Sequence, residues 1–359
     1  MRAYGNIRAE FPVASLAHKK GHEFMRLLIW GAGAIGGTLG AYLVRAGQDL
    51  LFVDIVEEHV KQINSAGLQI NGPVDEFRVE AEARLPRQLD GQYGAILLCV
   101  KSQHTRAASE SLAPFLADDG VVLSVQNGLN ELIISQLVGS ERTLGAFVNF
   151  SADYHAPGEI LFGGRGAVVI GELDGAISDR IQRMGAILRD FDDNAQVTDN
   201  IWGYLWGKEA YGAMLFVSAL THQSIAEALA DQRYRQLYIR AAQEILALAD
   251  KIGIQPVGFN GFEPAPFLAD ERAQINRSLD TLIEFNKLSA KTHSGIWRDL
   301  AVRKRKTEVS MYQPILAQAE AIGQDLPLTR RWIQMIGEIE DGKREQSLAN
   351  LDELNAELQ

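Results

Sequence analysis

The sequence has one cysteine, no long apolar run and a deficit of positive charge. With Cys99 alone, a disulfide framework and a cysteine-based metal site are both excluded. We find no His, Cys and carboxylate spacing typical of a zinc site, so we predict no metal. The stretch closest to a membrane span, 210–220, has 11 residues, whereas a span needs ~18 uncharged residues. We therefore predict no membrane partner.

The formal net charge is −11 over 359 residues. Nucleic-acid binding requires a clustered excess of lysine and arginine, so we predict no nucleic-acid partner. The basic run 303–306 is interpreted as a solvated turn of a polar helix. Residues 1–24 carry charges throughout and no central hydrophobic block, which is unlike a secretory signal. We expect them to form a disordered extension, and we expect a cytoplasmic protein.

Residues 27–54 have the pattern of a strand, a glycine loop, a helix and a second strand. In the loop, Gly31 permits a tight turn, Gly33 lets the backbone approach a pyrophosphate, and Gly36 lets helix and strand pack closely. The start of a helix favours the negative charge of a diphosphate. The pattern predicts a dinucleotide site made of Gly31, Ala32, Gly33, Ala34, Ile35, Gly36 and Asp54.

Asp54, which ends the second strand, also bears on the choice of dinucleotide. It lies 18 residues after Gly36, near the spacing of the acid that binds the adenosine ribose. A 2′-phosphate at ~4 Å from this carboxylate would cost on the order of 4 kcal/mol. Residues 54–58 contain no cation, so we predict NAD(H) over NADP(H). The alternative is that Asp54 only caps the following helix.

Strands and helices alternate up to about residue 197. This pattern predicts an α/β Rossmann domain over 25–197, a doubly wound and mainly parallel sheet whose ligands bind at the carboxyl ends of its strands. We expect an all-α domain over 198–345 and a tail over 346–359. The predicted strands are 68–70, 76–80, 95–100, 121–125, 143–150, 159–163 and 167–171. The predicted helices are 56–66, 104–117, 200–222, 224–252, 268–290, 293–323 and 327–341.

The helix expected from residue 200 is apolar on nearly every face, which indicates burial. Its only charged residues over 201–221 are Lys208 and Glu209. Burial lowers the pKa of a lysine, and a lysine tuned in this way is a good proton donor to a developing alkoxide. The alternative is a lysine that extends along its stem to the surface.

Several short segments together resemble the ketopantoate reductase (2-dehydropantoate 2-reductase) family over residues 26–342. The matching segments are the loop 31–36, Val100-Lys101-Ser102, Gln126-Asn127-Gly128-Leu129, Pro157-Gly158-Glu159, Ile170-Gly171-Glu172, Trp206-Gly207-Lys208, and a stretch from Ser294 through Arg298-Asp299 to Lys306-Thr307-Glu308. The resemblance implies that Lys208 is the general acid and that Glu308 holds the hydroxyl of the substrate. It also implies that Lys101 and Asn127 seat the nicotinamide.

The chain departs from that family where the substrate would bind. Asparagines that the family places four and eight residues after the lysine are Gly212 and Phe216 here, and paired serines become Ser294-Gly295. Loss of such hydrogen bonds changes specificity by large factors. We therefore expect a rebuilt pocket, in which His293 and Arg298 are candidates for holding a carboxylate. Packing at the domain interface is the alternative for both.

The sequence thus predicts an NAD(P)-dependent oxidoreductase of the ketopantoate reductase type that acts on a small oxo or hydroxy acid. The substrate residues are expected among Lys208, Gly212, Phe216, His293, Ser294 and Arg298. One alternative is genuine 2-dehydropantoate reduction in pantothenate synthesis. A second alternative is a non-catalytic NAD-binding module, which would not need a buried lysine. A homodimer, if formed, is expected to use the helical domain.

Overall fold

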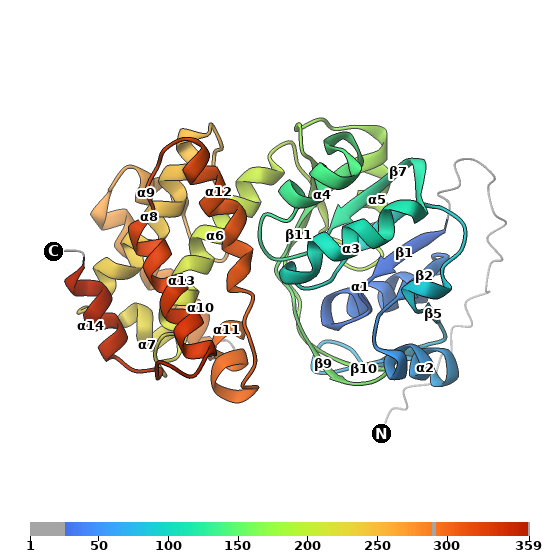
Figure 1. The fold of residues 1–359 in the computed structure, drawn as a ribbon, viewed down its shortest axis with the longest axis horizontal. Helices are drawn as coiled ribbons and strands as arrows, with labels where there is room; N and C mark the ends of the chain where they lie inside the picture. Colours follow the sequence, from blue (N-terminus) through green and yellow to red (C-terminus); the bar gives the residue numbers. More distant parts are fainter. Residues whose placement is uncertain (1–25, 289–291, 358–359) are drawn as a thin grey trace, which may run out of the picture.

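The computed structural model describes residues 26–288 and 292–357. Figure 1 shows an α/β half and a helical half that lie side by side, with helix α6 (Ile201–Ser218) running between them. The extension expected over residues 1–24 lies outside the described residues.

The α/β half is built on a sheet whose strands have the order β12-β11-β8-β7-β6-β1-β2-β5. Neighbouring strands are parallel except β8 and β11, which pair antiparallel. The prediction of a mainly parallel, doubly wound sheet is therefore confirmed. The strands are β1 Leu27–Trp30, β2 Leu50–Val53, β5 Glu82–Arg84, β6 Tyr93–Leu98, β7 Leu116–Ser124, β8 Thr143–Val148, β11 Val168–Glu172 and β12 Gln196–Val197.

Helices cover both faces of this sheet, and alternate residues of β1 show how. Leu27 and Ile29 join one apolar cluster with α1, while Leu28 and Trp30 join another with α3 and α4. A strand buried on both faces is apolar at every position, which explains its continuous hydrophobic run. The helices are α1 Ala34–Arg45, α2 Glu57–Ala66, α3 Thr105–Leu112, α4 Glu131–Val138 and α5 Asp179–Leu188.

A second, smaller sheet packs against α1 and has the order β4-β3-β10-β9. Its strands are β3 Leu68–Asn71, β4 Phe77–Val79, β9 Ser151–Ala156 and β10 Glu159–Gly164. The pair β3 and β4 was predicted, but β9 was not, because its residues Ser151 to Ala156 are mostly polar and partly exposed. This strand carries Asp153, which contacts Arg298 of the helical half.

The helix predicted over 104–117 is shorter in the structure. Helix α3 ends at Leu112, a 3₁₀ turn follows over Ala113–Phe115, and β7 starts at Leu116. Pro114 accounts for the difference, because proline lacks the amide hydrogen that would continue the α-helical hydrogen bonds beyond Ala113.

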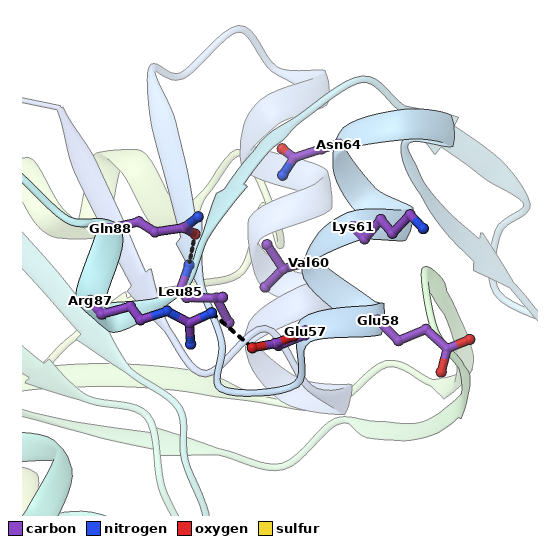
Figure 2. Close-up of a pocket in the computed structure, with 8 residues that line it drawn as sticks. All are labelled: Glu57, Glu58, Val60, Lys61, Asn64, Leu85, Arg87 and Gln88. Carbon is purple, nitrogen blue, oxygen red and sulfur yellow. Dashed lines mark hydrogen bonds and ion pairs between the residues drawn. The ribbon is translucent and has the colours of Figure 1, made fainter.

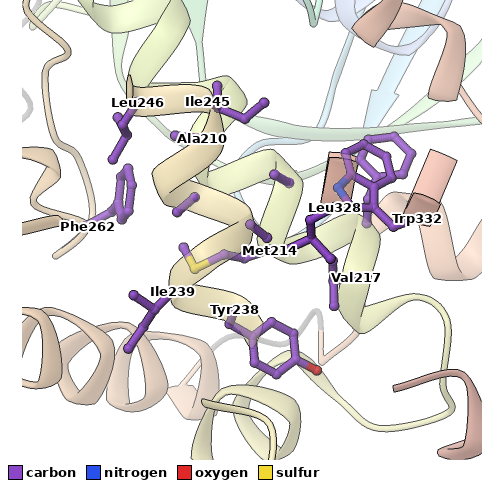
Figure 3. Packing of buried hydrophobic residues seen from close by; sticks show 14 of the residues in the cluster. Ala210, Met214, Val217, Tyr238, Ile239, Ile245, Leu246, Phe262, Leu328 and Trp332 are labelled. Carbon is purple, nitrogen blue, oxygen red and sulfur yellow. The ribbon is translucent and has the colours of Figure 1, made fainter. Parts of the chain in front are cut away.

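The helical half packs around α6 and α8, as Figure 3 shows for Met214, Ile239 and Leu246. Asn200 caps α6 as expected, because its side chain accepts a hydrogen bond from the N–H of Gly203. The other helices are α7 Ile225–Ala230, α8 Arg235–Lys251, α9 Pro264–Leu268, α10 Arg272–Leu288, α11 Gly295–Trp297, α12 Gln313–Ala321, α13 Pro327–Glu340 and α14 Ala349–Ala356.

Three predictions for the helical half need correction. The helix expected over 224–252 is divided into α7 and α8 by a turn over residues 231–234. The helix expected over 293–323 is interrupted between the π-helical turn Arg298–Val302 and α12, where Lys304 has a φ of 49°. The tail expected over 346–359 contains α14, whose Leu351 and Leu354 are fully buried in the helical core. No helix of the described residues is long and apolar enough to cross a membrane.

Candidate active site

The glycine loop between β1 and α1 packs closely at two of its glycines and is open at a third. Gly31 has a φ of +100°, and a Cβ there would lie 3.0 Å from Val100. A Cβ on Gly36 would lie 2.1 Å from the carbonyl oxygen of Gly31, so the loop and helix could not pack with larger residues. Gly33, by contrast, faces open space. The loop therefore leaves room for a ligand at the N-terminus of α1.

Asp54 follows β2 and points back to the same loop. Its Oδ2 accepts a hydrogen bond from the N–H of Ala32 (2.9 Å) and its Oδ1 accepts one from the N–H of Val56 (3.0 Å). Nearby, the cation Arg87 pairs with Glu57 at 2.8 Å. The sequence of residues 54–58 does not reveal this cation. Because Glu57 already balances this arginine, the surroundings of Asp54 gain no net positive charge.

Figure 2 shows the hollow around this ion pair, at the edge of the sheet between α2 and the turn Pro86–Gln88. Its volume is about 610 Å³. It is lined by Glu57, Glu58, Val60, Lys61, Asn64, Leu85, Arg87 and Gln88. None of the expected catalytic residues contributes to it.

Lys101 and Asn127 both lie just beyond the carboxyl ends of two neighbouring parallel strands. Lys101 follows β6 and Asn127 follows β7, and β6 lies between β1 and β7. The side chains therefore start from the same edge of the sheet as the glycine loop, which is where doubly wound sheets bind ligands.

Lys208 reaches this edge from α6. Its Nζ donates to Oδ1 of Asn127 (2.8 Å) and to the carbonyl oxygen of Val148 at the end of β8 (2.7 Å). The ring of Phe147 lies 5.5 Å from the same nitrogen. The side chain is partly buried and faces the α/β half, so the alternative of a lysine extended to the surface does not describe it.

The electrostatics around Lys208 combine burial with three acids. Burial lowers the pKa of the ammonium below its ordinary value, while Glu209, Glu308 and Glu131 oppose that shift. Burial raises the pKa of Glu131 to about 8, against the opposing effects of its own backbone N–H, the Ser124 hydroxyl and the charge of Lys208. Burial likewise raises the pKa of Glu209. Both acids therefore favour the protonated, neutral form. As neutral groups they stabilise the charged ammonium of Lys208 less than carboxylates would.

Glu308 stands at the start of the 3₁₀ turn Val309–Tyr312 in the helical half. Its Oε1 accepts a hydrogen bond from the N–H of Ser102 (3.1 Å), the residue after Lys101. The contact brings Glu308 to the same strand ends as Lys101.

Arg298 is tied across the two halves by ion pairs. Its Nη1 lies 2.9 Å from Asp153 on β9, and Arg303 lies 2.9 Å from the other oxygen of the same carboxylate. Arg303 and Arg305 also pair with Asp299, which in turn contacts Lys101 at 3.2 Å. Although burial alone would raise it, these cations hold the pKa of Asp299 below its ordinary value. Arg303 and Arg305 of the basic run thus join an interdomain ion-pair network, and the exposed run 303–306 is not helical as predicted.

His293 and Ser294 lie at the start of α11. The hydroxyl of Ser294 accepts a hydrogen bond from the N–H of Trp297, which makes it the N-cap of that short helix. The ring of His293 stacks on Trp297 with 3.9 Å between centroids. Among their described contacts, neither residue touches Lys208 or Glu308.

Gly212 and Phe216 follow Lys208 along α6 but face the helical core. Phe216 is 2 % exposed and stacks on Trp332 at 5.1 Å, with Tyr312 edge-on at 5.3 Å. A Cβ on Gly212 would lie 2.9 Å from the hydroxyl of Tyr312, which donates to the carbonyl oxygen of Glu209. The expectation that Phe216 lines the substrate pocket therefore needs correction, since its ring fills the core.

Two family models match the chain along most of its length. The model described as Ketopantoate reductase PanE/ApbA matches residues 27–175, and its C-terminal counterpart matches residues 200–340. The chain belongs to the ketopantoate reductase family. The expectation of an oxidoreductase resembling 2-dehydropantoate 2-reductase is confirmed with it.

Curated relatives of this ketopantoate reductase family member are named 2-dehydropantoate 2-reductase. One from Archaeoglobus fulgidus is 25 % identical over 323 residues, which cover 88 % of this chain and 98 % of the relative. One from Pyrococcus abyssi is 34 % identical over 186 residues, or 51 % of this chain and 60 % of the relative.

Two solved structures are similar to this chain along nearly their whole length. A PanE/ApbA family ketopantoate reductase from Ralstonia eutropha has a TM-score of 0.73 at 25 % identity and covers 89 % of this chain and 99 % of its own. A D-mandelate dehydrogenase, solved with NADH and anilino(oxo)acetate, has a TM-score of 0.76 at 22 % identity and the same coverage. At 22 % identity, the similarity to the D-mandelate dehydrogenase shows a shared fold.

Sequence reasoning missed two acids at the site of this family member, Glu131 and Asp153. Glu131 is in the first turn of α4, where an acid is ordinarily explained by the helix dipole. Asp153 lies in a strand that was not predicted. The only available signal was the position of Glu131 four residues after Asn127, just beyond the matched segment 126–129.

Proposed function

We propose that this chain is an NAD(H)-dependent oxidoreductase that interconverts a small 2-oxo acid and its hydroxy acid, with Lys208 as the general acid and base. The observation that carries the proposal is the position of the Lys208 ammonium. It comes from the helical half, is partly desolvated, and is held by Asn127 at the strand edge that also bears the glycine loop.

The contacts of Lys208 suit a proton donor. An ammonium has three N–H donors, and two of them go to Asn127 and Val148. Within the described residues no protein acceptor is recorded for the third, which is left for a substrate oxygen. In reduction the carbonyl oxygen would take this proton while Lys208 becomes a neutral amine. In oxidation the amine would take the proton of the hydroxyl.

The residues around the glycine loop fit a nicotinamide dinucleotide, which when bound supplies or accepts the hydride at the substrate carbon. The space at Gly33 would admit the diphosphate, and the N-terminus of α1 would stabilise its charge. Gly31, Ala32, Ala34, Ile35 and Gly36 complete the cradle, and Lys101 and Asn127 would border the nicotinamide.

Asp54 supports NAD(H) over NADP(H). One of its oxygens is fixed by the Ala32 N–H, which holds the carboxylate at the loop. A 2′-phosphate there would meet Asp54 and the acids at the start of α2, Glu57 and Glu58, while the cation Arg87 is already paired with Glu57. The D-mandelate dehydrogenase similar in fold was solved with NADH, which is a further reason to test this cofactor first.

For the substrate, we propose that Glu308 accepts a hydrogen bond from its hydroxyl and that Arg298 attracts its carboxylate. Arg298 has a buried Nε without a hydrogen-bond partner among the described residues. A guanidinium edge of this kind suits a carboxylate. For Ser294 we propose only a structural role, as the cap of α11. For His293, which stacks on Trp297, we propose no contact with the substrate.

Genuine 2-dehydropantoate reduction is the second candidate, favoured by the names of the curated relatives. A non-catalytic NAD-binding module is disfavoured, because it would not need a desolvated lysine. A homodimer through the helical half stays a prediction, which light scattering would test.

The experiment is a panel of 2-oxo acids, including 2-dehydropantoate and an aryl oxo acid, reduced with NADH and with NADPH. We expect turnover of at least one member with a higher kcat/KM for NADH. Efficient use of 2-dehydropantoate, at a kcat/KM of ~10⁴ M⁻¹s⁻¹ or above, would favour the second candidate. A higher kcat/KM with NADPH would contradict the argument from Asp54.

A further inference from the structure

His59, on the inner face of α2, has both ring nitrogens in hydrogen bonds and is 1 % exposed. Its Nε2 lies 2.8 Å from the carbonyl oxygen of Ala32, and its Nδ1 lies 2.9 Å from the backbone nitrogen of Gly158. A backbone N–H can only donate, so Nδ1 is the acceptor and carries no hydrogen. Nε2 therefore carries the ring hydrogen and donates it to Ala32.

Ala32 is the second residue of the glycine loop and is held from two sides. Its carbonyl oxygen accepts from His59, and its N–H donates to Asp54 at 2.9 Å. The preceding residue, Gly31, donates from its N–H to the carbonyl oxygen of Val53 at 2.8 Å. The orientation of the peptide groups that open the loop is thereby set by residues outside it.

Gly158 supplies a second fixed point for the His59 ring. It has a φ of +73° in the turn between β9 and β10, and its carbonyl oxygen accepts a hydrogen bond from the N–H of Gln69 on β3. The ring of Tyr154 on β9 packs edge-on against His59 at 5.1 Å. The small second sheet therefore braces His59 from the side opposite the loop.

We propose that His59 is a positioning residue that holds the glycine loop in its cofactor-binding conformation. The proposal rests on the proposed function, because it assumes that this loop binds a dinucleotide. A loop containing Gly31 and Gly33 has high conformational freedom. If it were ordered only on binding, the loss of that freedom would weaken affinity, whereas a loop ordered on folding avoids the loss.

Two isosteric variants separate the contacts of His59. In His59→Gln, the side-chain amide nitrogen lies at about the reach of Nε2 and can still donate to Ala32. In His59→Asn, the shorter side chain can replace Nδ1 and accept from Gly158, but it cannot reach Ala32. The proposal predicts that Gln restores cofactor affinity and that Asn does not.

Asn64→Ala is the matched control for loss of packing of α2. Asn64 lies on the same helix and ties it to β5 by two hydrogen bonds of 2.8 Å with the backbone of Ala83. It has no recorded hydrogen bond to the glycine loop. A merely structural role of His59 would be mimicked by this variant.

The test is titration of each full-length variant with NADH, followed by kcat at saturating cofactor and by thermal unfolding without cofactor. We expect His59→Ala to raise the dissociation constant of NADH about tenfold or more, the size of one lost hydrogen bond to a buried group. His59→Gln should stay close to wild type, with kcat unchanged at saturation. Asn64→Ala should lower the unfolding temperature without weakening binding.

Wild-type affinity in His59→Ala, or equal weakening in His59→Gln and His59→Asn, would overturn the inference. So would weakening in Asn64→Ala as large as in His59→Ala. If His59→Ala does not fold, the comparison of Gln with Asn still decides. Failure of the wild-type protein to bind either dinucleotide would instead overturn the proposed function, so the two failures are distinguishable.

Discussion

The Nζ of Lys208 lies 2.8 Å from Oδ1 of Asn127, and this contact joins the helical half to the carboxyl edge of the sheet. The two residues are 81 positions apart in the chain. Lys208 arrives on α6, whose first turn packs against Gly145 of β8 and Gly171 of β11. The interface between the halves therefore determines where the ammonium points.

Replacing Asn127 by Asp should change the pH dependence of the reaction. A carboxylate beside Lys208 favours the charged ammonium and raises its pKa. Because reduction needs the protonated lysine, its rate falls as pH rises through that pKa, and the fall should move to higher pH in Asn127→Asp. The pH profile of kcat for reduction measures this. Asn127→Ala is the uncharged control, and an identical profile for Asp and Ala would contradict the role of charge.

The buried carboxyl of Glu131 should make stability depend on pH. Burial raises its pKa from the ordinary value of 4.5 to about 8, so between these two pH values the folded state holds a proton that the unfolded state has released. Stability is therefore fully present below about pH 4.5 and falls as pH rises towards about pH 8. Glu131→Gln should remove this fall. Denaturant titrations across that pH range test it, and the same slope in both proteins would refute it.

Arg298 and Arg303 share the carboxylate of Asp153, which makes them a matched pair. If Arg298 also attracts the carboxylate of the substrate, Arg298→Ala should raise the KM of the oxo acid about tenfold or more, since hydrogen bonds between charged groups are worth roughly 1.5–3 kcal/mol. Arg303→Ala should weaken the ion-pair network with a smaller change in KM. Steady-state kinetics with both variants provide the measurement. Equal effects on KM would assign Arg298 to the interface alone.

Phe216 should matter for stability rather than for substrate choice. Its ring is buried between Tyr312 and Trp332, so Phe216→Ala leaves a cavity and should lower the free energy of unfolding by roughly 3–5 kcal/mol. Chemical denaturation measures the loss. The ranking of oxo acids by kcat/KM should stay the same, and a reordered ranking would show that the ring borders the substrate after all.

The α/β half could be predicted closely where local patterns decide the structure. Residues 27–54 carry their strand, loop and helix signals in consecutive positions, and the structure follows them. The break at 303–308 could not be predicted, because arginine and lysine favour helices. There the contacts of Arg303 and Arg305 with Asp299, together with the positive φ of Lys304, override that propensity.

The candidate site was predictable only in part, for a related reason. The positions of Lys101 and Asn127 could be predicted from the ends of strands. The position of Lys208 could be predicted from an apolar helix that contains a single cation. The direction of Phe216 does not follow, because α6 is apolar all round and spacing cannot tell the cleft from the core. The role of Asp153 depends on a partner 145 residues away, a separation that no local pattern reveals.

The most direct test of the account is the rate of oxo-acid reduction by NADH in Lys208→Ala, measured beside its affinity for NADH. Loss of a general acid should lower kcat by about 10²–10⁴-fold. The dissociation constant of NADH should stay within about twofold of the wild-type value. Lys251→Ala, at the exposed end of α8, is the control and should keep full activity. A Lys208→Ala enzyme that reduces the same substrate at the wild-type rate would contradict the account.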